Sequence, residues 1–251
     1  MARIDTLGNF LTDVATAIRN KKGTTDTIVA SNFDTEIESI ETGGGSSVTK
    51  GIIINKFNEK GYATDVSVVG MTSIPNYYFG TYSSTYTNAL NKYITNIRLP
   101  NDLTSIGSYA FNICKNLALT ELPSGITSIG SNAFNYCTRL ALTELPSGIT
   151  SIGSDVFASC TSLTEMTCLG NITSIGNYSF NGCTNLAKFA LPNTTSVPTL
   201  SSTSAFTNTP IASGTGYIYV PDNLVESFKS ATNWSTYAGQ IKAISEMEAG
   251  A

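Results

Sequence analysis

The stretch TSIGSNAFNYC, residues 127–137, occurs in this chain in four closely related copies. The other three are TSIGSYAFNIC from Thr104, TSIGSDVFASC from Thr150 and TSIGNYSFNGC from Thr173, so each copy starts 23 residues after the one before. A unit this short cannot bury its apolar residues alone, and neighbouring units must stack into one continuous core. The repeat therefore predicts a solenoid, an α+β repeat protein built from coils of 23 residues.

Aligned in register, the repeat units span residues 95–117, 118–140, 141–163 and 164–186. The two middle units are identical at 18 of 23 positions. Each column of the alignment should form a ladder of equivalent side chains along the stack. Seven columns never vary in the four units, and in the second unit they are Thr127, Ser128, Ile129, Gly130, Phe134, Cys137 and Leu140.

Within each unit, two segments have strand-like patterns, such as LTEL at 119–122 and GITSI at 125–129. We expect both segments to pair with the next coil at about 4.8 Å. The segment NAFNYC that follows should form a helical turn that returns the chain. Gly130 would give the backbone freedom at this corner, and Ser131 is placed to cap the turn.

Atypical units are expected at both ends of the solenoid, where the stack must stop exposing its core. The segment MTSIPNYYF from Met71 repeats the pattern with Pro75 in place of glycine and about nine extra residues before the next unit. After the fourth unit, KFALPNTTSVPTL ends in Ser196, Val197 and Pro198, one residue short of the expected register.

These motifs resemble the BspA-like leucine-rich repeats, whose units read roughly L-x-x-I-x-x-x-A-F-x-x-C-x-x-L. ITSIGSNAFNYCTRL and ITSIGSDVFASCTSL match that pattern closely, and the resemblance covers about residues 71–244. It implies a solenoid of the leucine-rich-repeat type. It also suggests, as one functional hypothesis, a bacterial cell-surface adhesin that binds a host protein or glycan.

The recurring cysteine is interpreted as a core residue. The chain has five cysteines, and the fifth, Cys168, lies in a column where the other units have leucine. Side chains in a ladder run parallel, which does not suit the dihedral angle of a disulfide, and thiols in a line do not converge as zinc ligands do. We therefore expect small buried hydrophobic side chains beside the phenylalanine ladder, with no metal site.

Composition argues against several classes of function. The chain has no histidine, which removes the commonest general base and metal ligand. A net charge of −4 without a basic cluster makes nucleic acid an unlikely partner, and no apolar run is long enough for membrane insertion. Glu121 and Glu144 lie in one column and could suggest a glycosidase pair, but duplication explains them better, with Arg98 as a neighbour of Glu121 on the surface. We expect no enzyme activity and no cofactor.

Pattern changes divide the chain into five parts. Residues 1–42 are predicted to form a small helical attachment or oligomerisation module, and 43–50 a glycine- and serine-rich linker. Residues 51–70 should form a β-hairpin that covers the N-terminal edge of a solenoid over 71–200. Residues 201–251 should form a C-terminal cap with a strand and an amphipathic helix.

The N-terminal sequence DVATAIRNKKGTTDTIVASNFDTEIESIE resembles the start of tail-fibre and tail-tip proteins of phages and prophages. The resemblance covers about 40 residues and implies a module that attaches to other virion or tail proteins. It also implies a homo-oligomer, with a trimer favoured, made in the bacterial cytoplasm and located in the virion tail, where the repeats bind a bacterial surface protein or glycan. Self-association, docking on a larger assembly and a simple cap on the solenoid all remain possible for this module. The start of the chain shows no secretion signal, and the bacterial cell surface is the alternative location.

The positions that vary between units are candidate contacts. The middle units differ only around the fixed phenylalanine and cysteine, and these positions either face solvent without function or form a tuned contact surface. A tyrosine-rich insertion near residue 80 is a rival surface, because tyrosine gives a large contact area at low entropic cost. A flat solenoid face has no obvious pocket, so contact would be extended. The candidate contacts are Tyr82, Tyr86, Tyr109, Asn132, Tyr136, Arg139, Asp155 and Tyr178.

Overall fold

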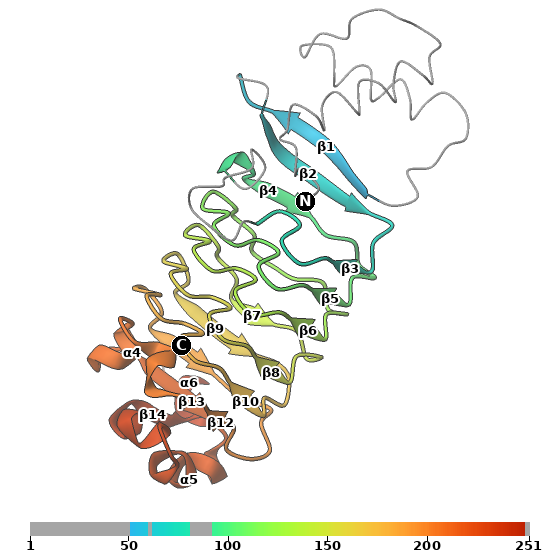
Figure 1. The fold of residues 1–251 in the computed structure, drawn as a ribbon. Coiled ribbons are helices and arrows are strands. Elements are labelled where there is room, and N and C mark those ends of the chain that lie inside the picture. The colour runs from blue at the N-terminus through green and yellow to red at the C-terminus, as the bar shows by residue number, and fades with distance from the viewer. Residues whose placement is uncertain (1–50, 60–61, 81–91, 249–251) are drawn as a thin grey trace, which may run out of the picture.

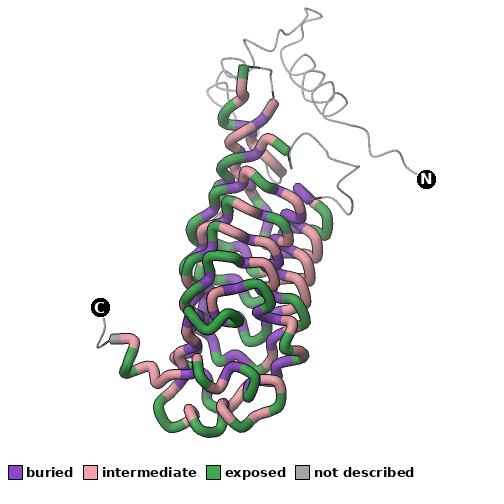
Figure 2. Tube along the Cα trace, turned by 90° about the vertical axis from the view of Figure 1, so that its left-hand side faces the viewer, coloured by how far each residue is buried: buried purple, intermediate pink, exposed green. Residues whose placement is uncertain are grey.

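The computed structural model describes residues 51–59, 62–80 and 92–248, which form an elongated stack of coils (Figure 1). The predicted helical module over 1–42 and the linker over 43–50 lie outside these residues, as do Tyr82 and Tyr86. Buried positions recur along the whole length of the stack (Figure 2). The core is therefore one continuous column of apolar side chains, as stacked short units require.

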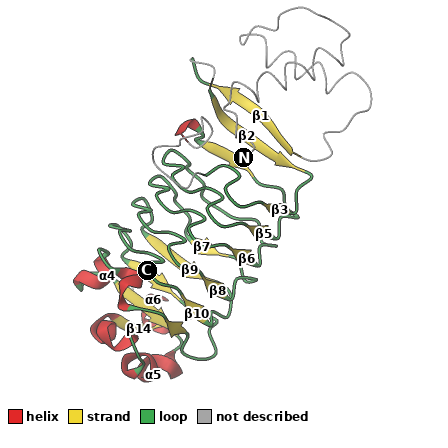
Figure 3. Ribbon diagram, viewed as in Figure 1, coloured by secondary structure: helices red, strands yellow, loops and turns green. Residues whose placement is uncertain are grey.

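Two rows of short parallel strands run along the stack (Figure 3). Their residues pair in register, as Ser105 does with Ser128 and Ser151 does with Ser174. The strands of the first row are β4 (Asn96–Arg98), β7 (Glu144–Leu145), β9 (Glu165–Cys168), β11 (Lys188–Ala190), β13 (Tyr217–Val220) and β14 (Ile241–Ala243). Those of the second are β3 (Ser73–Ile74), β5 (Ser105–Ile106), β6 (Ser128–Ile129), β8 (Ser151–Ile152), β10 (Ser174–Ile175) and β12 (Thr199–Leu200).

Both rows are interrupted in the middle of the stack. In the first row β4 and β7 belong to different sheets, and in the second β6 and β8 do. The segment LTEL at 119–122, expected to be a strand, is not one. The two most similar units are therefore the ones whose strands do not pair, because strand pairing depends on how neighbouring coils are placed as well as on the sequence of each coil.

The returning segment of each coil is a series of tight turns, and the prediction of a helical turn was wrong. Each of the four repeat units has two residues with positive φ, such as Asn132 at 59° and Tyr136 at 58°, and a left-handed residue interrupts a right-handed helix. Amide groups here bond to the following coil, as Asn132 N–H does to the Ser154 carbonyl oxygen at 3.1 Å. The turns thus join all the units, including the two whose strands are unpaired.

Gly130 serves close packing, which differs from the expected role. Its φ is not among the positive values, so the corner does not need a left-handed residue. A Cβ atom added there would lie 2.4 Å from the backbone nitrogen of Ser108 in the preceding coil. Only glycine lets the two backbones approach this closely.

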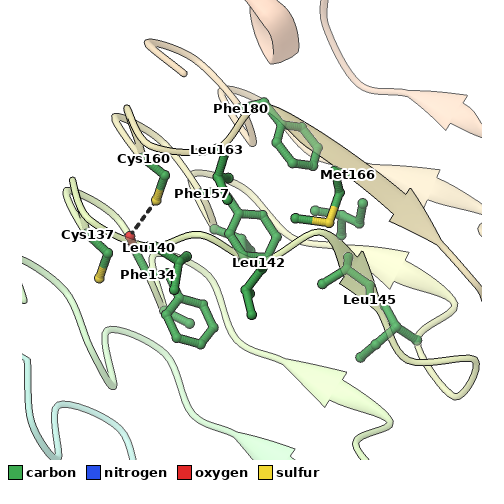
Figure 4. Close-up of a cluster of buried hydrophobic side chains, with 14 of the residues drawn as sticks. Phe134, Cys137, Leu140, Leu142, Leu145, Phe157, Cys160, Leu163, Met166 and Phe180 are labelled. Atoms are coloured by element: carbon green, nitrogen blue, oxygen red, sulfur yellow. Dashed lines mark hydrogen bonds between the residues drawn. The ribbon is translucent and has the colours of Figure 1, made fainter. Parts of the chain in front are cut away.

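Phenylalanine rings form a stacked ladder through the core (Figure 4). The centroids of Phe111 and Phe134 lie 5.2 Å apart and those of Phe134 and Phe157 5.7 Å apart, with nearly parallel rings. The ladder starts at Phe79 and ends at Phe206, so it crosses the break in the strand rows. The aromatic core and the outer turns therefore hold the two halves together.

At the N-terminal end, β1 (Gly51–Phe57) and β2 (Ala63–Val69) form an antiparallel hairpin, and β2 pairs in parallel with β4. The hairpin thus supplies a strand to the first coil and covers its edge.

At the C-terminal end, the last coil differs from the expected register. Thr199 and Leu200 pair with β10, and Ser196 and Val197 lie outside the ladder because the coil contains extra residues. Trp234 is fully buried against Phe228, which closes the core. The helices of this end are η2 (Thr203–Phe206), α4 (Pro210–Ser213), η3 (Asp222–Leu224), α5 (Val225–Ser230), η4 (Trp234–Gln240) and α6 (Ile244–Glu248).

Candidate binding surface

The cysteines lie in the core and bind backbone carbonyl groups. The Cys160 thiol donates to the Phe134 carbonyl oxygen at 3.1 Å (Figure 4). Cys137 and Cys183 make the same bond to the phenylalanine one coil earlier. Burial raises the pKa of each thiol, to about 12 for Cys183, so the thiols stay protonated at neutral pH. A buried, protonated thiol is a poor nucleophile and a poor metal ligand.

Over residues 51–59, 62–80 and 92–248, no three residues of the histidine, cysteine, aspartate or glutamate types cluster as metal ligands would. Among the helices that the structure describes, none combines the length and the apolar character that a membrane span needs.

Five left-handed residues form one row along the outer turns, here called the turn row. They occupy the same column in successive coils, with φ between 56° and 59°, and they are Tyr77, Tyr109, Asn132, Asp155 and Tyr178. The side chains of Tyr77 and Tyr178 are 44% and 48% exposed. The ring centroids of Tyr77 and Tyr109 lie 4.8 Å apart with an interplanar angle of 9°. The row therefore presents stacked rings at one end, polar side chains in the middle and a further ring at the other end.

Backbone hydrogen bonds fix the turn row. The amide of Tyr109 bonds to the Ser131 carbonyl oxygen at 3.0 Å, and the amide of Asp155 bonds to the Asn177 carbonyl oxygen at 2.9 Å. Partial burial raises the pKa of the Asp155 carboxyl. Because hydrogen bonds to the next coil fix the backbone of the turn row, the Cα and Cβ atoms of its residues have defined positions.

Other candidate contacts lie apart from this row. Tyr136 is 48% exposed and has φ of 58°, but it belongs to a second left-handed column that also contains Ile113. Arg139 is exposed three residues further along. Tyr77 was not among the sequence candidates, although its place in MTSIPNYYF, equivalent to that of Tyr109, could have identified it.

A groove lies beside β4, which contradicts the expectation of a face without a pocket. Its volume is about 580 Å³. One wall comes from residues 96–101 and the other from residues 118–124, the part of the unit 118–140 that does not form a strand. The polar lining residues are Asn96, Arg98, Asn101, Thr120, Glu121 and Ser124.

Arg98, expected to lie beside Glu121, pairs with Asp65 of β2 instead. Its two terminal nitrogens donate to the two carboxylate oxygens at 2.9 and 3.3 Å. Burial raises the pKa of Asp65, but hydrogen bonds from Asn55 and Asn96 and the charge of Arg98 outweigh it, so the pKa is lowered. The hairpin strand β2 brings Asp65 to Arg98, and repeat spacing alone gave no signal for this pair.

Comparisons with known structures found similar solenoids. One is a leucine-rich repeat protein of T. pallidum, 23% identical over 59% of this chain and 71% of that one, with a TM-score of 0.43. Another, from Bacteroides ovatus ATCC 8483, is 22% identical over 68% and 36% of the two chains, with a TM-score of 0.33. A leucine-rich cell surface protein of Faecalibacterium prausnitzii A2-165 is 19% identical over 72% and 60%, with a TM-score of 0.32. This chain thus spans less than two thirds of the last two structures.

The family comparison covers more than half of the chain. Curated proteins gave no significant match. A family model described as the BspA type leucine-rich repeat region matches residues 72–212 in six copies. These are the residues whose phenylalanine ladder, cysteine-to-carbonyl bonds and paired short strands make up the stack. The chain therefore belongs to the BspA-type leucine-rich repeat family.

Proposed function

We propose that this protein is a non-enzymatic recognition protein that binds an extended ligand on a cell surface through the turn row. The observation that carries the proposal is the alignment of five side chains from successive coils in one backbone conformation, with Tyr77 and Tyr178 exposed and the three between them partly exposed. Tyrosine buries a large area on contact while losing little rotamer entropy, and a fixed backbone reduces the ordering cost of binding. The ligand is a surface protein or a glycan.

The first biological setting is the bacterial cell surface, with the protein acting as an adhesin. Membership of the BspA-type family supports this setting. Each coil contributes one exposed or partly exposed residue to the turn row, so the affinity of a single chain is expected to be modest. Several copies on one surface would raise the apparent affinity through multivalency.

The second setting is the tail of a phage or a phage-like particle, with the repeats as the receptor-binding part. It is supported by the sequence pattern of residues 1–42, which would attach the protein to other tail proteins and assemble a homo-oligomer, a trimer in the favoured case. Light scattering on the full chain and on a chain that starts at Val48 tests this attachment. Loss of a trimer on truncation favours it, and an unchanged monomer contradicts self-association.

A binding experiment tests the turn row. The full chain is compared with a Tyr109→Asn/Tyr178→Asn double variant in binding to intact bacterial cells, extracted cell-wall polysaccharide and immobilised host matrix proteins. Asparagine is chosen because it tolerates positive φ, so the backbone should not change. Ile113→Asn is the matched control, since it alters a left-handed residue of the other column.

The expected result is at least about a tenfold loss of binding for the double variant, because each tyrosine is a large contact. The control variant should bind as the unchanged chain does. Equal binding by the double variant would remove the turn row from the proposal. Release of products from the polysaccharide by the full chain would contradict the non-enzymatic part.

A further inference from the structure

The groove beside β4 exists because one sequence takes two conformations. ALTELPSG occurs twice, at 118–125 and 141–148. The second copy forms β7, which pairs with β9, and its Leu145 is 1% exposed. In the first copy no strand forms, and the equivalent Leu122 is only partly buried. The first copy, residues 118–125, thus does not pair with its neighbour β4, although the same sequence forms a strand in the second copy.

The strand β4 is the edge of its sheet. It pairs with β2 on one side, and the sheet order is β1-β2-β4. On the other side, the amide of Ala118 bonds to the Thr95 carbonyl oxygen at 2.9 Å, just before β4 begins. Beyond this bond the groove lies between β4 and the segment 119–124. Backbone groups of an edge strand that lack a strand partner are a template for an added strand.

The size of the groove fits a short strand. A strand residue needs roughly 160 Å³, from a rise of about 3.3 Å, a strand spacing of about 4.8 Å and a sheet thickness of about 10 Å. The volume of about 580 Å³ is of the order of three to four such residues. The strand β4 is three residues long, so the groove matches the edge that would pair.

The charge of the groove favours a basic ligand. Among the residues that line it, only Arg98 and Glu121 are charged. The hydrogen bonds of Arg98 to both carboxylate oxygens of Asp65 neutralise it. Glu121 is exposed and forms no salt bridge with a residue of the described chain. A lysine or arginine on the ligand would complement it.

From these observations we propose that the groove binds an extended peptide segment of three to four residues, which adds to β4 as a strand and places a basic side chain beside Glu121. This site differs from the turn row, so its test is independent of the proposed function.

The test uses a defined peptide and the full chain. The probe is an acetylated, amidated pentapeptide of sequence valine–threonine–lysine–threonine–valine, titrated into isotope-labelled protein while amide NMR signals are recorded. We expect shifts at residues 96–98 and 119–124, with none at β7. A peptide methylated at alternate backbone nitrogens should not bind, because strand addition needs its amide groups.

The matched variants are Glu121→Gln and Glu144→Gln, which change equivalent positions of the two ALTELPSG copies. Glu121→Gln should weaken binding of the lysine peptide about threefold at low salt, the size of an exposed ion pair. Glu144→Gln should leave it unchanged. The proposal is overturned if the methylated peptide binds equally well, if both variants behave alike, or if no groove signal moves up to about 10 mM peptide. Groove shifts with maltohexaose but not with the peptide would also overturn it and assign the groove to a glycan.

Discussion

Replacing Cys160 by serine tests whether the repeated cysteine is a hydrogen-bond donor as well as a small core residue. Its thiol is fully buried and donates to the Phe134 carbonyl oxygen at 3.1 Å. Cys168 is equally buried, but it lies in the leucine column and its thiol has no hydrogen bond within the described residues. The same substitution at Cys168 is therefore the matched control.

The expected difference follows from the partner of the new hydroxyl. At Cys160 the serine hydroxyl can donate to the Phe134 carbonyl oxygen, so the cost is about 1 kcal/mol, mainly from lost apolar burial. At Cys168 the hydroxyl is buried without a partner, which costs a further 1–3 kcal/mol or so. Cys168→Ser should therefore be the less stable variant by about 2 kcal/mol.

Thermal and urea unfolding of the two serine variants measure this difference. For a chain of this size, about 2 kcal/mol corresponds to a difference in Tm of roughly 4–8 °C. Both variants keep the same stack, which makes the comparison valid even if the repeats unfold in more than one step. Equal stability of the two variants, or a lower stability of Cys160→Ser, would refute a donor role for the thiol.

Three further predictions concern the turns, the close contacts and the thiols. At Asn132, with φ of 59°, replacement by glycine should be nearly neutral and replacement by alanine should cost about 1 kcal/mol in urea unfolding; equal costs would contradict backbone strain there. Gly130→Ala should be far more destabilising than Gly153→Ala. The atom nearest to an added Cβ is the backbone nitrogen of Ser108 at 2.4 Å in the first case and a serine side-chain oxygen at 3.3 Å in the second. Similar losses of Tm for the two variants would show that the break between the middle coils is closed in solution. Burial raises the pKa of Cys183 from 9.0 to about 12, so its stabilising contribution is complete below pH 9 and is lost as pH rises from there, by about 1.4 kcal/mol at pH 10. Urea midpoints measured from pH 7 to 10 should therefore fall less for Cys183→Ala than for the unchanged chain.

The candidate contacts were partly predictable. The variation between the middle units pointed to Asn132, Tyr136 and Asp155, but it also includes Ala133 and Val156, which are buried, so variation alone does not separate surface from core. That Asn132 and Asp155 share a row with Tyr77, while Tyr136 belongs to another, depends on left-handed backbone conformations that repeat spacing does not specify. The groove beside β4 could not be predicted, because the two ALTELPSG copies are identical in sequence and differ only in their neighbours.

The sequence by itself determined the stack and its core ladders, because a 23-residue period with invariant Phe134 and Cys137 columns can bury these side chains only by placing equivalent residues above one another. Only the tertiary structure decided where strands pair and where they separate. Asp65 takes Arg98 away from Glu121, and the first ALTELPSG copy stays unpaired beside β4. These outcomes rest on contacts between coils and the N-terminal hairpin, which local sequence does not encode, since strand pairing and ion pairing depend on the groups that face each segment.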